Sequence, residues 1–184
     1  MDYARLNEVE KKALLKAARL AIEYYLDKKD VGEIKTAEER LYQLKLGCFV
    51  TLKKSGNLRG CIGTFSSREN LFDNVKKMAI AAAFDDPRFD RLVKKELTDI
   101  HIEISVLYPL IKIASLDEIL VGRDGLYIVY NYHSGVLLPQ VATEYVWNKE
   151  EFLSHTCQKA GLPMDAWKKL PIEIYRFEAE FFGE

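Results

Sequence analysis

A β-hairpin is predicted by the stretch Cys48-Phe49-Val50-Thr51-Leu52-Lys53-Lys54-Ser55-Gly56-Asn57-Leu58-Arg59-Gly60-Cys61-Ile62-Gly63-Thr64. Its two ends, residues 48–53 and 58–64, have the apolar and β-branched composition of strands. Ser55-Gly56-Asn57 between them is typical of a tight turn. Strands joined by a tight turn pair antiparallel, so this stretch indicates the kind of sheet that the protein contains.

A long amphipathic helix is expected before the hairpin, from Asn7 to about Asp27. Asn7 and Glu10 have the spacing of a capping box at its start. One apolar face follows at helical spacing and is expected to be the buried one. This face comprises Val9, Ala13, Ala17, Leu20, Ala21 and Tyr24. Residues 28–39 then form a polar connection.

The remaining elements repeat the pattern of the hairpin region. After the first hairpin we expect a helix opened by a Ser66–Glu69 capping box and ending near Asp85, and then a strand over 100–107. A short helix capped by Ser115 and Glu118 comes next, followed by strands over 125–132 and 136–138 with a turn at Ser134-Gly135. The last elements are a helix from Asn148 to about Ala160 and a strand over 172–182. The series hairpin, helix, strand thus occurs twice. It predicts an α+β fold with a largely antiparallel or mixed sheet and a structural duplication.

Composition and charge narrow the class of protein. The 184 residues include 27 Lys and Arg and 28 Asp and Glu, for a formal net charge of −1, and 48% are apolar. This balance is typical of a globular protein and argues against nucleic-acid binding, which usually needs a basic excess. The N-terminal residues lack an apolar signal core, and no run approaches the ~20 apolar residues of a membrane span. We therefore expect a cytoplasmic protein without membrane association.

The cysteines and histidines follow no metal-binding motif. Cys48, Cys61 and Cys157 fit neither CxxC, zinc nor iron–sulfur spacing. An odd and sparse set of cysteines is typical of a reducing compartment. The three histidines show no i, i+4 pairing. We expect no metal site and no cofactor.

The densest group of candidate functional residues is Arg59-Gly60-Cys61-Ile62-Gly63. In a strand, Arg59, Cys61 and Gly63 share one face, where the guanidinium would stabilise a thiolate. Gly60 and Gly63 would let a ligand approach the backbone. The alternative is structural: Cys61 is a buried free cysteine, and the glycines relieve packing against a helix. A bulge at Gly60 would change the register and separate Arg59 from Cys61.

Other candidates lie outside this group. Arg88 follows Asp86-Pro87 and would present a cation from a loop, or else would bind the carbonyls at the end of the preceding helix. Gln140 lies at a strand end, where polar groups reach ligands, or is a satisfied turn amide. His101 and Glu103 share a strand face as an acid–base pair would, although a half-solvated sheet face explains them more simply.

The segment Leu58-Arg59-Gly60-Cys61-Ile62-Gly63-Thr64-Phe65 resembles the signature of the AMMECR domain family, also called AmmeMemoRadiSam system protein A. Further stretches match the family in order: Gly47 to Leu52, Ala81 to Phe89, Ile102 to Leu107, Gly135 to Ala142, Lys159 to Pro163, Trp167, and Phe177 to Ala179. The resemblance covers nearly the whole chain. Tyr130-Asn131-Tyr132-His133 departs from it, because the family tends towards a basic, glycine-containing turn there. A role for His133 is therefore not carried over.

The resemblance implies a single α+β domain over residues 1–184, built from two related halves. These would surround a curved, barrel-like and mostly antiparallel sheet flanked by helices, with a cleft between two lobes lined by residues 58–65. It also implies two kinds of partner: a Memo-type protein, similar to extradiol dioxygenases, and a radical S-adenosylmethionine protein. It implies no particular reaction, because the activity of the family is unsettled.

Two functions follow from these observations. In the first, the chain is an enzyme or enzyme subunit that acts on a small molecule, with Cys61 as nucleophile or covalent anchor. The binding residues would then be Arg59, Gly60, Gly63, Arg88 and Gln140. In the second, the chain is a non-catalytic adaptor for the Memo-type and radical enzymes, and Cys61 is structural. We favour the first interpretation.

Overall fold

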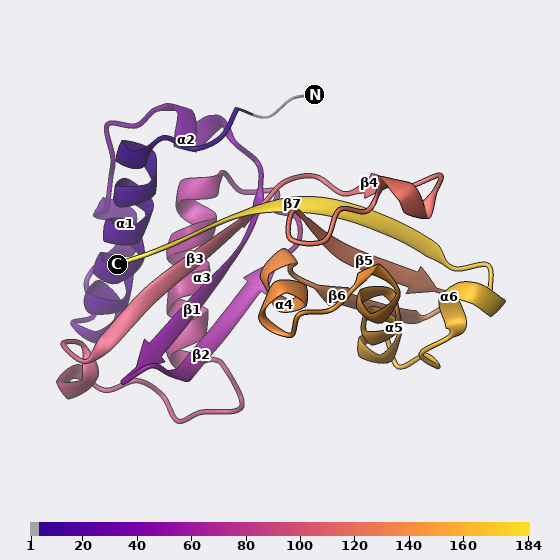
Figure 1. Ribbon diagram of the computed structural model, residues 1–184. Coiled ribbons are helices and arrows are strands. Elements are labelled where there is room, and N and C mark those ends of the chain that lie inside the picture. Colours follow the sequence, from indigo (N-terminus) through magenta and orange to yellow (C-terminus); the bar gives the residue numbers. More distant parts are fainter. Residues whose placement is uncertain (1–3) are drawn as a thin grey trace. The chain divides into compact units, whose positions relative to one another are not determined.

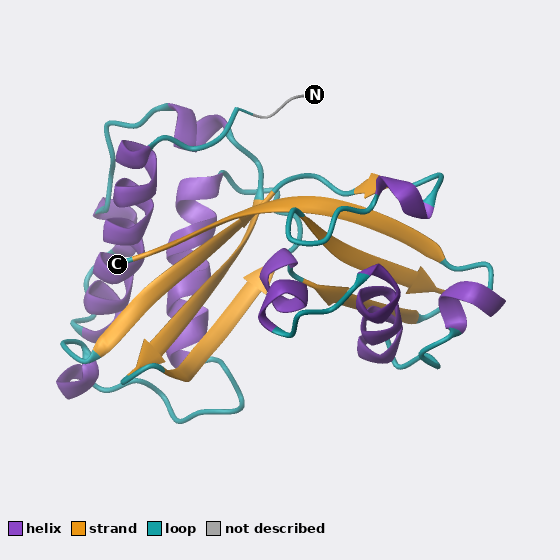
Figure 2. Cartoon of the chain, viewed as in Figure 1, coloured by secondary structure: helices purple, strands orange, loops and turns teal. Residues whose placement is uncertain are grey.

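The computed structural model describes residues 4–184, and it divides the chain into two compact units. Unit 1 is the chain up to Leu107 together with Glu180–Glu184, and unit 2 is Tyr108–Ala179. Figures 1 and 2 show that each unit combines strands with helices. None of the helices within residues 4–184 is long and apolar enough to span a bilayer.

Unit 1 is built on three antiparallel strands. These are β1 (Gly47–Lys54), β2 (Asn57–Thr64) and β3 (Ile100–Leu107), in the order β2-β1-β3. The helices are α1 (Glu8–Leu26), α2 (Arg40–Gln43) and α3 (Leu71–Phe84), with 3₁₀ turns at Val31–Glu33 and Lys94–Glu96. Helix α3 packs against β1 and β2, and α1 packs against α3 and β3. The sheet therefore has one face covered by helices.

The buried core of unit 1 lies between this face and the helices. Alternate strand residues point into it and are inaccessible to solvent: Cys48, Val50, Leu52, Ile102, Ile104 and Val106. The period-two pattern over residues 100–107 is thus the pattern of a half-covered strand. The intervening residues of β1, β2 and β3 point to the opposite face, which we call the open face.

Unit 2 repeats this plan. Its strands β5 (Asp124–Tyr130), β6 (His133–Leu137) and β7 (Glu173–Gly183) are ordered β6-β5-β7, and β4 (Ile111–Lys112) pairs with β7. Its helices are α4 (Pro139–Glu144), α5 (Lys149–Lys159) and α6 (Ala166–Lys169), and Leu116–Glu118 is a 3₁₀ turn. Helix α5 packs against β5 and β6. The last residues of β7, from Glu180, belong to unit 1.

The two units share one topology. In each, the first strand of a hairpin is central and pairs antiparallel with both the second strand and the strand after the helices. In each, the second strand carries a glycine where a helix crosses. A Cβ on Gly60 would lie 2.1 Å from the Ala82 carbonyl oxygen, and a Cβ on Gly135 would lie 2.3 Å from the Ala160 nitrogen. The predicted α+β fold with related halves and a mostly antiparallel sheet flanked by helices is confirmed.

Two predicted boundaries are wrong. Helix α3 begins at Leu71 rather than after Ser66, because Asn70 caps it by accepting a hydrogen bond from the Asp73 N–H. The β5–β6 turn lies at Asn131-Tyr132, where Asn131 adopts a positive φ of 51°, and not at Ser134-Gly135. Asparagine tolerates this left-handed conformation, so the turn needs no glycine.

The predicted buried face of α1 is also wrong in part. The buried residues are Glu10, Leu14, Ala17, Ala18, Ala21 and Ile22. Ala17 and Ala21 belong to both sets, but Val9 is 60% exposed. The larger side chains Leu14 and Ile22 direct the helix towards the core, and the stripe that contains Val9 is turned outwards.

Candidate functional site

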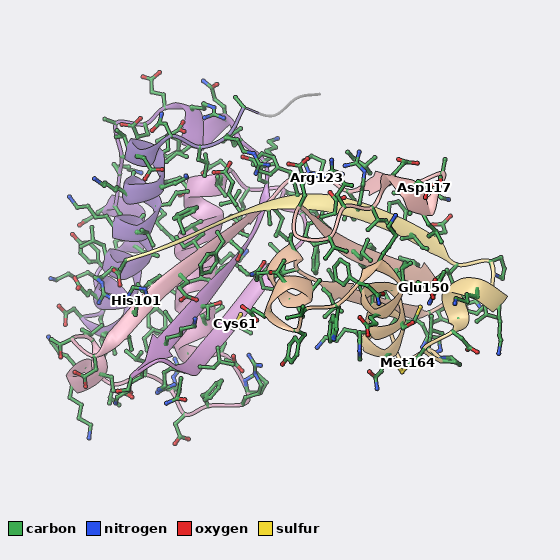
Figure 3. The ribbon with its side chains drawn as sticks, viewed as in Figure 1. Cys61, His101, Asp117, Arg123, Glu150 and Met164 are labelled. Atoms are coloured by element: carbon green, nitrogen blue, oxygen red, sulfur yellow. The ribbon has the colours of Figure 1, made fainter. Side chains whose placement is uncertain are left out.

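Cys61 lies on β2 with its side chain on the open face of unit 1 (Figure 3). Gly60 contacts α3, and neighbouring strand residues point to opposite faces, so Cys61 points away from the helix. The side chain is half-buried, whereas Cys48 and Cys157 are buried. Burial raises the pKa of the Cys48 thiol well above its ordinary range, and it also raises the pKa of the Cys157 thiol. Cys61 is therefore the accessible thiol among the described residues.

A row of polar side chains crosses the open face at Cys61. Thr51 is paired with Cys61 on one side and with Glu103 on the other. The Thr51 hydroxyl lies 3.2 Å from the Cys61 sulfur, to which it donates a hydrogen bond. Lys53 forms an ion pair with Glu103 at 2.8 Å. The Cys61 sulfur thus contacts a hydroxyl and shares its face of the sheet with a carboxylate and an ammonium group further along the row.

The backbone of Cys61 is held at the sheet edge by an acid–arginine pair. The Cys61 N–H donates to Asp86 Oδ2 at 2.8 Å, and Arg88 Nη2 donates to the Cys61 carbonyl at 3.3 Å. Arg88 also donates to Asp86 through Nε and Nη2, at 2.9 and 2.7 Å. Hydrogen bonds from the Arg88 side chain, and then from the Cys61 and Arg88 N–H groups, hold the pKa of the buried Asp86 carboxyl well below its ordinary value.

Arg59 is engaged elsewhere. Its Nε and Nη2 donate to Glu96 at 3.2 and 3.0 Å, and Lys54 donates to the same carboxylate at 3.0 Å. These partners, Arg59 foremost, lower the pKa of Glu96 to about 2. The β1–β2 register shifts between Leu52 and Lys53, which leaves Arg59 without a partner residue on β1. Arg59 Nη1 is buried without a hydrogen-bond partner within the described residues.

Packing explains both glycines of the motif. Gly60 lets α3 approach the strand, as described above. A Cβ on Gly63 would lie 2.3 Å from the Phe49 ring and 2.5 Å from the Cys48 carbonyl oxygen. Gly60 thus packs against a helix, as the structural alternative expected, whereas Gly63 packs against strand β1 and not against a helix.

Gln140 belongs to unit 2 and is described with that unit. It is the second residue of α4, is half-buried, and its carbonyl accepts a hydrogen bond from the Thr143 hydroxyl at 2.8 Å. Of the predicted site residues, the structure thus brings Arg88 directly to Cys61, and it pairs Arg59 with Glu96.

The three histidines have separate environments. His101 lies exposed on β3, opposite Lys53 (Figure 3). His133 contacts the Ala160 carbonyl at 3.2 Å, and His155 stacks on Trp147 with ring centroids 3.9 Å apart. Within residues 4–184, no three His, Cys, Asp or Glu side chains are grouped closely enough to hold a metal ion.

Sequence reasoning missed Thr51, Asp86 and Glu96 as partners of the motif. Thr51 and Glu103 lie in predicted strands, so correct register would have found the row across the open face. The sequence pattern singles out Asp86 only as the residue before Pro87. Glu96 has no sequence signal, because a lone glutamate after a loop is commonly a solvated surface residue.

The fold and the site together define an α+β protein whose hairpin–helix–strand halves are duplicated and whose accessible thiol lies on one sheet face. Residues 15–182 match the model of the AMMECR1 family. The chain therefore belongs to the AMMECR1 family. A protein of Methanothermobacter thermautotrophicus is 43% identical over 190 residues that cover 100% of this chain and 99% of that one.

Further relatives agree with this assignment. Protein MJ0810 of Methanocaldococcus jannaschii is 43% identical over 175 residues, covering 91% of this chain and 86% of its own. The crystal structure of the uncharacterized protein PH0010 from Pyrococcus horikoshii superposes with a TM-score of 0.83 at 42% identity. That match covers 93% of this chain and 89% of PH0010.

Proposed function

We propose that the chain acts on a small molecule through the Cys61 thiol, as a cysteine-dependent enzyme or enzyme subunit. The observation that carries the proposal is the half-buried sulfur on the open face, which accepts a hydrogen bond from Thr51. The hydroxyl orients the sulfur, and the thiolate form is the nucleophile of cysteine chemistry. In the reaction proposed, the sulfur would bond to an electrophilic carbonyl carbon, whose π electrons would move to the carbonyl oxygen.

Arg88 is the cation best placed to assist an anionic substrate. Its side chain is 55% exposed, whereas that of Arg59 is 14% exposed and bound to Glu96. The Cys61 N–H is occupied by Asp86, so it is not free to stabilise an oxyanion. We therefore assign substrate attraction to Arg88 and a structural role to the Arg59–Glu96 pair. A cytoplasmic location belongs to the same proposal, since three free cysteines suit a reducing compartment.

The test compares alkylation of each cysteine by neutral iodoacetamide and by anionic iodoacetate, followed against pH by mass spectrometry. Cys61 should react in the native protein, while Cys48 and Cys157 should react only after denaturation. Thr51→Val should change the rate at which Cys61 is alkylated several-fold. The matched variant Thr98→Val, at an exposed position, should leave this rate unchanged.

The charge assignment has its own control. Arg88→Gln should lower the ratio of the iodoacetate to the iodoacetamide rate, and Arg88→Lys should largely restore it. Both arginines are paired with a carboxylate, but the Arg59 side chain is only 14% exposed, so Arg59→Gln should leave the ratio near that of the wild type. A Cys61 thiol that stays inert until the protein unfolds would refute the proposal.

The alternative proposal is an adaptor that binds the Memo-type and radical S-adenosylmethionine proteins without turnover. Two observations favour it. Packing accounts for Gly60 and Gly63, and the backbone N–H and carbonyl of Cys61 are already hydrogen-bonded to Asp86 and Arg88. A stable complex with either protein that survives Cys61→Ala would support it. Absence of a complex by gel filtration of the purified proteins would count against it.

A further inference from the structure

A groove runs along α1 in unit 1, apart from the Cys61 face. One wall is α1 between Val9 and Leu20, the other is the segment Ile34–Glu38, and the buried Phe72 lies beneath. The volume of this open groove is about 380 Å³. The proposed reaction at Cys61 uses none of these residues.

The helical wall of the groove is an apolar stripe of α1 that is not buried in the core of unit 1. Val9, Ala13 and Leu20 recur at helical spacing, yet Val9 is 60% exposed and the other two are half-buried. The stripe spans twelve residues, or about 17 Å of helix. It offers three turns of apolar surface that the unit itself does not cover.

The opposite wall is held in place before any ligand binds. The Thr36 N–H donates to the Tyr42 hydroxyl at 3.1 Å. The buried Lys76 donates to the Ile34 carbonyl at 3.4 Å, and an ion pair with Asp73 at 2.8 Å holds the lysine. The groove is therefore preformed, which reduces the entropy that an occupant loses on binding.

Three lysines give the groove a positive rim. Lys12 and Lys16 lie one turn apart on α1, and Lys35 lies on the other wall. All three are exposed, and none forms a hydrogen bond or ion pair with another residue in the described part of the chain. Glu38 is the acidic residue of the lining. Cations on both sides of an apolar floor are complementary to a ligand with carboxylates on both sides of an apolar stripe.

We propose that this groove binds an acidic amphipathic helix of a partner protein. Its apolar residues would pack on Val9, Ala13 and Leu20, and its Asp and Glu side chains would face the three lysines. The small side chain of Ala13 lets a second helix approach α1 closely. Cations distributed along both rims suit several carboxylates, whereas a single fatty-acid carboxylate would need one cation at one end.

The test is fluorescence anisotropy with a labelled helical peptide of about 18 residues, or five turns. Leucines occupy one face of the peptide, and glutamates flank them; a matched peptide carries lysines instead. The acidic peptide should bind the wild type at least about tenfold more tightly than the basic one, and added salt should weaken its binding.

Variants locate the site. Lys12→Glu, Lys16→Glu and Lys35→Glu together should weaken binding of the acidic peptide by about tenfold or more. The control combines Lys45→Glu, Lys95→Glu and Lys159→Glu, which changes the net charge equally at exposed positions outside the groove. Ala13→Trp should fill the groove and abolish binding while the circular dichroism spectrum is retained.

Four results would overturn the proposal. Equal binding of both peptides would show that the charge of the rim does not select the ligand. Equal weakening by the two triple variants would show unspecific charge attraction. Unchanged binding by Ala13→Trp would place the peptide elsewhere. Binding of cis-parinaric acid without binding of either peptide would identify a lipid carboxylate as the ligand. Cys61→Ser should leave peptide binding unchanged, so this test and that of the thiol fail independently.

Discussion

Four hydrogen bonds converge on the carboxylate of Asp86, from the Cys61 N–H and from the backbone N–H, Nε and Nη2 of Arg88. Together with the Arg88 bond to the Cys61 carbonyl, they pair the outer edge of β2 as a further strand would. An unpaired edge strand is open to pairing with other chains, and this pair closes the edge at Cys61. Asp86 thus stabilises the fold and positions the thiol.

Asp86→Asn should lower the free energy of unfolding by roughly 2–4 kcal/mol, because it leaves a buried amide and an unpaired Arg88 in place of the ion pair. Urea denaturation measures the change. Asp90→Asn, at an exposed position nearby, should change the stability by less than about 0.5 kcal/mol. Equal stability of the two variants would contradict the role given to Asp86.

Glu96 should make the stability of the protein depend on pH. Its pKa is about 2 in the folded protein, against an ordinary value of 4.5, so the folded state binds the proton less readily than the unfolded state does. The stabilisation is complete above about pH 4.5 and is lost as the pH falls towards 2; it amounts to about 3 kcal/mol.

The measurement is the free energy of unfolding between pH 2 and 6 for the wild type and Glu96→Gln. The free energy of unfolding should depend less on pH in the variant, because the variant lacks this carboxyl. The difference in free energy of unfolding between the two proteins should be largest above pH 4.5. Parallel profiles would show that Glu96 titrates normally.

At the scale of elements, the second strand of each hairpin is shaped by a helix that crosses it. Gly60→Ala and Gly135→Ala should each cost roughly 2–4 kcal/mol, because a Cβ would meet backbone atoms of α3 or of the α5 terminus that cannot move alone. Gly32→Ala is the control, since its Cβ meets the flexible Asp30 side chain at 3.0 Å. A cost in one hairpin without the other would show that the two crossings are not equivalent.

At the scale of the whole molecule, the end of the chain stabilises unit 1. Glu184 accepts hydrogen bonds from Arg19 and, at 3.0 Å, from the Ile102 N–H, and Glu180 accepts one from the Leu6 N–H at 3.0 Å. Arg19 also binds the carbonyls of Leu97 and Ile100 at 2.9 Å each. The final residues of β7 therefore link α1 to β3.

Glu184→Ala should speed hydrogen exchange at the Ile102 amide by about tenfold, the equivalent of one lost hydrogen bond of roughly 1.4 kcal/mol. Exchange of the β5 amides should not change. Glu144→Ala, at an exposed position in unit 2, is the control. Unchanged exchange at Ile102 would show that β3 is held without the side-chain carboxylate of Glu184.

Local patterns predicted most elements of this protein. The strand over Ile100–Leu107 and the capping boxes at Asn7 and Asn148 were found as expected. The turn predicted over Ser55-Gly56-Asn57 is one residue shorter, because Asn57 already begins β2. Alternation, capping and turn chemistry act between near neighbours, so the sequence displays them directly. The buried face of α1 was predicted wrongly in part because two adjacent stripes of the helix are apolar at helical spacing. Packing against α3 and β3 determines which of these stripes is buried.

The amino-acid sequence was sufficient to predict the family, the α+β class and the presence of a thiol within a hairpin strand. The face of the sheet that carries this thiol depends on strand register, which is seen in the three-dimensional fold. Counting back from the turn pair Lys54–Asn57 without a shift would pair Cys61 with the buried Val50; the observed shift pairs it with Thr51. A slip of one residue moves a strand side chain to the opposite face. The register shift leaves Arg59 without a partner on β1, and Arg59 binds Glu96 instead. Because Glu96 is distant along the chain, no pattern of neighbouring residues predicts this contact.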